Sequence, residues 1–173
     1  MNTGVSRSKK LGWGSTPSGT FRFKKIDGSF CNGETFRFAD YTMSLLKTAF
    51  FNFSAIVFDY NKSQFYYDDA FVHFLENRMM DVVYVKNPNI PLCIINSCYY
   101  REKYGFGLSL KLCEWIFNNY FSLTSNLKAE FNFDKVQKQH FLRGVISYND
   151  LKDFVLLCYR HYKIGVPIFP KFM

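Results

Sequence analysis

Residues 92–100 have the sequence LCIINSCYY, an apolar run that is interrupted only by Asn96 and Ser97. A continuous apolar run of this length is typical of a strand that is buried on both faces of a sheet. The preceding segment, Lys86–Pro91, contains two prolines and predicts a loop. We therefore predict a long central strand over Leu92–Tyr100, with the other elements arranged around it.

The other segments mix strand-like and helix-like patterns. Period-two alternation indicates strands, and apolar residues three or four positions apart indicate helices. Because strands and helices do not alternate strictly, we predict an α+β fold with a small mixed or antiparallel sheet and four to five helices. After residue 38 the predicted elements are a helix over 40–52, strands over Ala55–Asp59, Gln64–Tyr67 and Val82–Val85, helices over 68–79, 108–122, 134–145 and 149–163, and an extended tail with Pro167 and Pro170.

Residues 20–38 alternate aromatic and basic side chains. Phe21-Arg22-Phe23-Lys24 has a period of two, and Phe36-Arg37-Phe38 repeats the pattern. Asp27-Gly28 and Asn32-Gly33 are pairs that favour two-residue hairpin turns. These features predict a β-meander with one aromatic face, which we expect to be core, and one basic face.

The first 19 residues predict a basic, flexible extension of a single domain that covers residues 20–173. Gly, Ser, Thr and Pro dominate the segment, so it has little to bury. Arg7, Lys9 and Lys10 face no acidic residue within it, and Trp13 is its only large ring. We expect such an extension to lie on a polyanion.

The composition combines many aromatic rings with positive charge. The 173 residues include 21 Phe and 12 Tyr, and the net charge is +8. A chain of this length can bury a proper core, but rings beside Lys and Arg are also what nucleic-acid-binding proteins present. Residues 1–38 and 101–173 each carry +5, whereas residues 39–100 carry −2. This asymmetry indicates contact with a polyanion at the two ends of the chain.

Codon composition gives a separate indication of origin. Phe, Tyr, Asn and Lys, whose codons are A/T-rich, far outnumber Ala, Gly, Pro and Arg, whose codons are G/C-rich. Organelle genomes, some viruses and some microbes of low G/C content show this bias. Because the chain begins at Met1, we expect no cleaved transit peptide and synthesis within the organelle itself.

Cysteine and histidine usage predicts no metal site and no cofactor. The five cysteines are odd in number and lie in apolar contexts, which is typical of buried free thiols in a reducing compartment. No spacing of the cysteines and the three histidines suits a structural zinc ion. The apolar runs are too short to cross a bilayer and no secretory signal is present, so we expect no membrane insertion.

Two short segments resemble known families. Phe141-Leu142-Arg143-Gly144 resembles the signature helix of LAGLIDADG homing endonucleases, which implies a helix over residues 141–150. That family places a metal-binding acid where this chain has Asn149, and its second copy falls on Asp27-Gly28-Ser29, so the resemblance implies an inactive relative. Gly105-Phe106-Gly107 resembles the aromatic strand of an RNA recognition motif, or else is a plain glycine-rich loop.

The sequence favours a protein that is not an enzyme. Asp134, His140 and Arg143 lie on one predicted helix and could form a general base held by a carboxylate, or simply a solvated helix face. No nucleophile motif, phosphate-binding loop or metalloprotease motif occurs. We predict no catalytic residue.

These observations predict a non-enzymatic, RNA-associated component of a large ribonucleoprotein. In type the chain resembles ribosomal proteins encoded in mitochondrial genomes, without matching a specific family. The resemblance implies ribosomal RNA and neighbouring ribosomal proteins as partners, a place in the mitochondrial matrix, and no role as a free monomer. The alternatives are a structural or accessory protein of a virus with an A/T-rich genome, found in the viral particle or cytoplasm, an accessory subunit of a respiratory complex, and the inactive endonuclease relative.

Two sets of residues are candidates for contact with these partners. The helix over 149–163 ends in basic residues, which could face phosphate or could cap the helix. The cluster after the predicted central strand could dock on a neighbour or could be core. We predict RNA contacts at Arg7, Lys9, Lys10, Trp13, Arg22, Lys24, Lys25, Arg37, Arg160 and Lys163, and a protein interface at Tyr99, Tyr100, Arg101, Tyr104 and Phe106.

Overall fold

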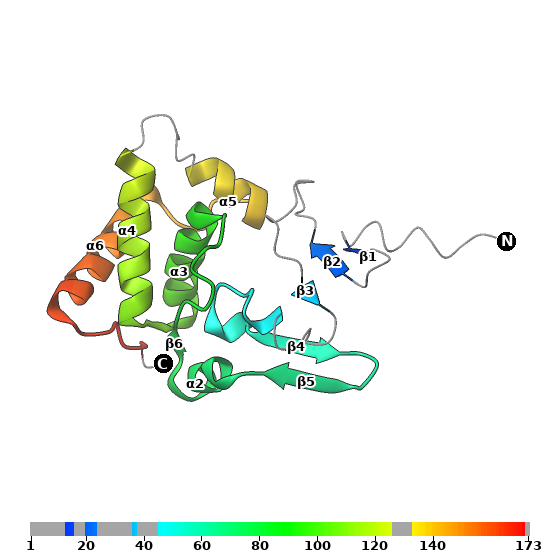
Figure 1. The fold of residues 1–173 in the computed structure, drawn as a ribbon. Coiled ribbons are helices and arrows are strands. Elements are labelled where there is room, and N and C mark those ends of the chain that lie inside the picture. Colours follow the sequence, from blue (N-terminus) through cyan, green and yellow to red (C-terminus); the bar gives the residue numbers. More distant parts are fainter. Residues whose placement is uncertain (1–12, 16–19, 24–35, 38–44, 126–132, 172–173) are drawn as a thin grey trace. The chain divides into compact units, whose positions relative to one another are not determined.

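The computed structural model describes residues 13–15, 20–23, 36–37, 45–125 and 133–171 (Figure 1). Helices and short strands, both antiparallel and parallel, confirm the predicted α+β class. The chain divides into two compact units, Met1–Leu45 and Leu46–Met173. The sequence placed a boundary after residue 19, whereas the contacts place it after Leu45.

The first unit contains a three-stranded antiparallel sheet. Its strands are β1 (Trp13–Ser15), β2 (Thr20–Phe23) and β3 (Phe36–Arg37), in the order β1-β2-β3. Strands β2 and β3 confirm the strands predicted at these positions, with Phe21 opposite Phe36. Strand β1 lies inside the segment predicted to be a basic, flexible extension, and it pairs antiparallel with β2. Arg7, Lys9, Lys10, Lys24, Lys25 and both predicted turns lie outside the described residues.

The start of the second unit differs from the helix that was predicted over residues 40–52. Residues 40–44 lie outside the described part, helical structure ends at Leu46, and the short 3-10 helix η3 covers Asn52–Ser54. Phe51 forms an isolated antiparallel bridge with Val82. Asn52 is buried, and its side chain accepts from the N–H of Asp81 at 3.0 Å and donates to the carbonyl of Met79 at 2.9 Å. These long-range hydrogen bonds replace those of a continued helix.

A hairpin and a helix follow as predicted. Strands β4 (Ile56–Asp59) and β5 (Gln64–Tyr67) pair antiparallel. The Asp59 carboxylate accepts from the N–H groups of Asn61 and Lys62 and so fixes the turn. Helix α2 (Asp69–Asn77) begins at the capping residue Asp68, which accepts from the N–H of Phe71. It ends two residues earlier than predicted, where Arg78 adopts left-handed geometry.

The predicted central strand is wrong, because residues 92–100 belong to helix α3 (Ile90–Tyr104). Pro91 lies in the first turn, where its missing N–H costs nothing, and Gly105 ends the helix in left-handed geometry. The buried side chains include the consecutive residues Cys93, Ile94 and Ile95. Consecutive residues point about 100° apart around a helix, so burial on several sides removes the period that would have marked it as helical. The predicted loop correspondingly ends at Asn89 instead of Pro91.

Short parallel strands join the end of α2 to the end of α3. Strand β6 (Met79–Met80) pairs with β7 (Gly107–Leu108), whereas the strand predicted over Val82–Val85 is reduced to the single bridge at Val82. A Cβ atom on Gly107 would lie 2.6 Å from the carbonyl oxygen of Ile168, so only glycine fits this close approach. Ile168 also bridges to Leu108, which ties the C-terminal segment to β7.

Three further helices complete the unit: α4 (Leu110–Ser125), α5 (Phe133–Phe141) and α6 (Tyr148–Ile164). Figure 1 shows α4 and α6 running side by side with α3 next to them, while α2 and the hairpin lie at one end of these helices. Helices α4 and α6 confirm the predictions, and Ser147 caps α6 by accepting from the N–H of Asp150. The core contains Ile94 and Ile95 of α3, Leu112, Trp115 and Ile116 of α4, and Leu151, Phe154, Val155 and Cys158 of α6.

Helix α5 ends at Phe141 and not at residue 145. Leu142 adopts a left-handed conformation with φ of 60°, and residues 142–147 are not helical. The buried side chain of Gln137 accepts from the N–H groups of Val145 at 2.8 Å and Ile146 at 2.9 Å. These bonds hold the turn, so the helix over 141–150 that the endonuclease resemblance implied is absent.

Candidate functional site

An aromatic cluster lies where helices α2 and α3 end. We define it as Phe53, Phe74, Tyr100, Tyr104 and Phe106. Phe74 and Phe106 meet edge to face with centroids 4.9 Å apart, and Tyr104 stacks near-parallel with Phe106 at 5.5 Å and with Tyr100 at 6.0 Å. Phe53 completes the inner part, at 5.2 Å from both Phe74 and Tyr100. The cluster therefore runs from the core to the surface.

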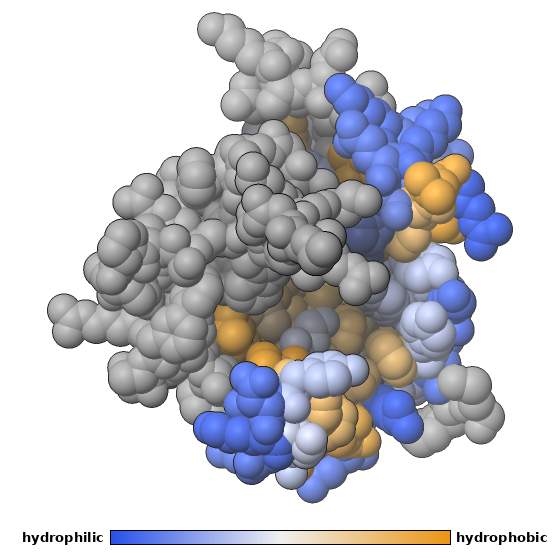
Figure 2. Space-filling view, turned by 90° about the vertical axis from the view of Figure 1, so that its right-hand side faces the viewer, coloured by the Kyte–Doolittle hydropathy of each residue, from blue (hydrophilic) through white to orange (hydrophobic). Residues whose placement is uncertain are grey.

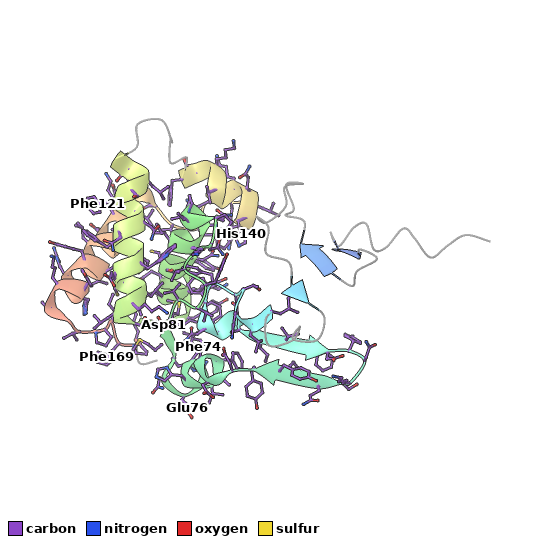
Figure 3. All side chains as sticks on the ribbon, viewed as in Figure 1. Phe74, Glu76, Asp81, Phe121, His140 and Phe169 are labelled. Carbon is purple, nitrogen blue, oxygen red and sulfur yellow. The ribbon has the colours of Figure 1, made fainter. Side chains whose placement is uncertain are left out.

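The exposure of the cluster rises outward. Phe74 is buried, Tyr100 and Phe106 are partly buried, and Tyr104 is 39% exposed. Figure 3 labels two residues of α2 on opposite sides of that helix, with Phe74 toward the other helices and Glu76 away from them. The sequence left open whether these rings are core or surface. In the structure the inner rings of the cluster belong to the core, and Tyr104 lies at the surface.

Lys103 places a positive charge beside the outer rings. Its Nζ donates to the hydroxyl of Tyr99 at 2.8 Å and lies 5.1 and 5.0 Å from the ring centroids of Tyr99 and Tyr104. Hydrogen bonds with Tyr99 and then Tyr104 raise the pKa of Lys103. Burial raises the pKa of Tyr100, so both groups keep their protons at neutral pH. The surface therefore holds the ammonium group of Lys103 close to the rings of Tyr99 and Tyr104.

A shallow groove of about 400 Å3 opens beside Tyr104. Three segments form it: the end of α2, the end of α3 and the C-terminal tail. Lys171 in the tail forms an ion pair with Glu102 at 2.7 Å, and its backbone N–H donates to the carbonyl of Gly105 at 2.7 Å. The lining residues are Glu76, Asn77, Arg78, Tyr104, Gly105, Phe106, Pro170 and Lys171.

Arg101 does not belong to the exposed surface at which the sequence placed it. Its side chain is buried, and Nη1 donates to the carbonyl oxygens of Phe106 at 3.3 Å and Phe169 at 3.4 Å. Its Nε finds no hydrogen-bond partner in the described part of the chain. Arg101 thus ties the C-terminal tail to the end of α3, because a buried guanidinium must use nearby carbonyl groups.

A second aromatic surface lies on the β4–β5 hairpin. Residues directly opposite each other in an antiparallel pair project to the same face, so Phe58, Phe65 and Tyr67 share one face. The centroids of Phe58 and Phe65 are 4.7 Å apart, and Tyr60 at the turn is 88% exposed. Figure 2 looks onto the tip of this hairpin, at the bottom of the view, where hydrophobic residues lie beside hydrophilic ones.

The other predicted contact residues that the structure describes lie on four different elements. Arg160 and Lys163 are exposed on α6, and Lys163 Nζ lies 5.5 Å from the centroid of Tyr159. Trp13, Arg22 and Arg37 lie on β1, β2 and β3, whose backbone alone is described. Within the described ranges, no hydrogen bond or ring contact joins Arg160 or Lys163 to the aromatic cluster.

The acid–base arrangement considered from the sequence is not assembled on one helix. Asp134 and His140 are exposed on α5, and Arg143 follows the helix beyond the turn at Leu142. The ring of His140 meets Phe141 edge to face at 4.6 Å. Residues 45–125 and 133–171, with the described strands of the first unit, contain no group of three potential metal ligands and no helix able to span a membrane.

Sequence reasoning found the rings of residues 99–106 because they are neighbours in the chain. It missed Phe53, Phe74, Arg78 and Lys171, which reach the same place from distant segments. No local pattern marks them, since only the tertiary structure brings them together. In comparisons with known proteins, no family model, curated protein or solved structure matches this chain.

Proposed function

We propose that the protein is a non-enzymatic, RNA-associated structural component of a large ribonucleoprotein, and specifically of a mitochondrial ribosome. One observation carries the RNA part of the proposal: Lys103 is held against the partly buried ring of Tyr99 and the exposed ring of Tyr104. Bases stack on aromatic rings and phosphates pair with cations, so this combination suits RNA. The net charge of +8 supports the same partner.

Arg78 adds a second cation to this surface. It lines the groove beside Tyr104, is exposed, and forms no ion pair with a described carboxylate. By contrast, Lys171 is already paired with Glu102. An unpaired arginine at the rim of an aromatic surface is a suitable phosphate contact.

The aromatic face of the hairpin supports a permanent place in an assembly. Phe58, Tyr60, Phe65 and Tyr67 are exposed together, and the hairpin carries only Asp59 and Lys62 as charged residues. An exposed aromatic face with few charges suits a protein neighbour better than RNA. The proposals of mitochondrial encoding and of a place in the ribosome rest on the A/T-rich codon usage and on the basic ends of the chain.

Co-sedimentation of the tagged chain from its own cells tests the proposal. We expect the chain to travel with ribosomal RNA in a density gradient and to be released by ribonuclease and by high salt. Recovery with capsids would favour the viral alternative, and detergent-dependent recovery with membrane subunits would favour the respiratory one. A chain that stays at the top of the gradient would overturn the proposal.

A further inference from the structure

Leu142 is an apolar residue that is exposed to solvent and has an unfavourable backbone conformation. It is 90% exposed and has a φ of 60°, in the left-handed region that favours glycine. Helices often end with a left-handed residue, but that residue is usually glycine. Leucine here adds backbone strain and removes no apolar surface from water. Strain of this kind at an exposed apolar residue is a reason to look for function.

The buried side chain of Gln137 fixes the conformation of the turn that presents Leu142. Gln137 is 1% exposed, and its amide group makes three hydrogen bonds to the turn. Its Oε1 accepts from the N–H groups of Val145 and Ile146, and its Nε2 donates to the carbonyl of Ile146 at 3.1 Å. A buried polar side chain that is satisfied in this way makes the conformation of the turn specific.

Two cationic residues lie near the exposed leucine in the chain. Lys138 and Arg143 are both exposed, and neither forms an ion pair with a carboxylate in the described part of the chain. Gly144 has open space around it, with no atom within 4 Å of a Cβ built there. The turn thus presents one apolar side chain flanked by cations, with room for a partner to approach.

We propose that the turn at residues 142–144 is an RNA-contacting wedge, in which Leu142 packs against base or ribose surface while Lys138 and Arg143 bind phosphates. Charge complementarity selects RNA over an apolar protein groove, because neither Lys138 nor Arg143 forms an ion pair with a described carboxylate. Leucine is one of the side chains that nucleic-acid-binding proteins insert against bases. The wedge rests on the proposed RNA association and adds a contact just after Phe141, whose ring centroid lies 5.0 Å from that of Tyr99.

Leu142→Gly separates binding from stability. The change relieves the left-handed strain and removes only exposed surface, so the urea midpoint of the full chain should rise. Affinity for a fluorescein-labelled RNA that carries an A-form stem and a single-stranded uridine tract should fall roughly fivefold. Ile164→Ala, at another exposed apolar residue, is the control and should leave RNA affinity unchanged.

Arg143→Gln tests the phosphate contact. It should weaken binding of the same RNA and lower the slope of log affinity against log salt by about one. Lys62→Gln on the hairpin is the matched charge control and should leave the slope nearly unchanged.

The outcomes distinguish this proposal from the proposed function. If the unaltered chain binds no RNA at low salt, the proposed function fails and the wedge with it. If it binds but Leu142→Gly and Arg143→Gln bind equally well, only the wedge is overturned. A loss of stability in Leu142→Gly, or normal RNA affinity with lost incorporation into particles, would instead assign Leu142 to the fold or to a protein neighbour.

Discussion

Gln137 is the buried polar residue of helix α5. Its replacement by alanine leaves the N–H groups of Val145 and Ile146 without their acceptor. We expect Gln137→Ala to lower the free energy of unfolding by about 2 kcal/mol, because unmade hydrogen bonds of partly buried groups are costly. Urea denaturation monitored by circular dichroism measures this.

Gln139 provides the matched control on the same helix. It is exposed, so Gln139→Ala should change the free energy of unfolding by no more than about 0.5 kcal/mol. Equal effects of the two substitutions would show that the turn does not depend on Gln137.

Cys98 predicts a dependence of stability on alkaline pH. It is 1% exposed, and burial, followed by the charges of Glu102 and Asp150, raises its pKa from 9.0 to about 12. Below pH 9 the thiol is neutral in both states, and the stability that it contributes is fully present. As the pH rises from 9 toward 12, the unfolded chain loses the proton first and this stability is lost.

The comparison of the unaltered chain with Cys98→Ala isolates this effect. The difference in their free energies of unfolding should shrink by about 1.4 kcal/mol between about pH 8 and pH 10. Thiol labelling of the folded chain at Cys98 should stay slow over the same range, because the thiolate is the reactive form. A difference that does not change with pH would contradict the raised pKa.

At the scale of elements, the ends of the helices depend on particular glycines. Gly105 and Gly165 both have a φ of 69°, but a Cβ on Gly105 would lie 3.1 Å from the carbonyl oxygen of Lys171, whereas Gly165 is open. Gly165→Ala should cost about 1 kcal/mol from strain alone. Gly105→Ala should cost about 2 kcal/mol, because it also disturbs the C-terminal tail.

Gly144→Ala is the control for both substitutions. Its backbone is not in the left-handed region and its surroundings are open, so the change should be neutral or slightly stabilising. Thermal unfolding of the three variants gives the order directly. Equal losses for Gly105→Ala and Gly165→Ala would mean that the contact with Lys171 contributes nothing.

Helix α3 shows why a sequence can locate an element correctly and still predict the wrong type of element. Helices α4 and α6 were predicted correctly because each has an apolar stripe and a polar face, as with the exposed Lys111 and Asn118 of α4. Helix α3 has buried residues on several sides, so a short apolar run could equally be a central strand. Pro91 and Gly105 were the available signals, since they mark the two ends of a helix.

At the scale of the whole molecule, the two units predict separable properties. All core residues that the structure describes lie in residues 46–173. Residues 1–45 hold seven basic and three acidic side chains and therefore carry half of the net charge. We expect the fragment 46–173 to unfold in one cooperative urea transition. It should bind RNA more weakly, with a smaller dependence on salt.

Fluorescence of Trp115, the only tryptophan of that fragment, monitors the transition. A broad transition without a sharp midpoint would contradict an independent core in residues 46–173. Unchanged salt dependence of RNA binding would contradict a role for the basic residues of the first unit.

The sequence by itself determined the α+β class, the two strands of the hairpin, the helices α4 and α6, and the wealth of rings and positive charge. Each of these depends on neighbours in the chain, such as Asp59 with Asn61 and Lys62, or Ser147 with Asp150. Local hydrogen bonding and side-chain periodicity act over a few residues, so the sequence displays them directly.

Only the tertiary structure decided that residues 92–100 are helical, that Arg101 is buried, and that Leu142 is strained and exposed. It also decided which distant residues meet, such as Asn52 with Asp81, Phe53 with Phe74, and Arg101 with Phe169. Burial and long-range hydrogen bonds depend on the packing of the whole unit, and their free energies outweigh local propensities of a few tenths of a kcal/mol per residue. The candidate site is made of such long-range contacts, and therefore its members could not be assembled from the sequence alone.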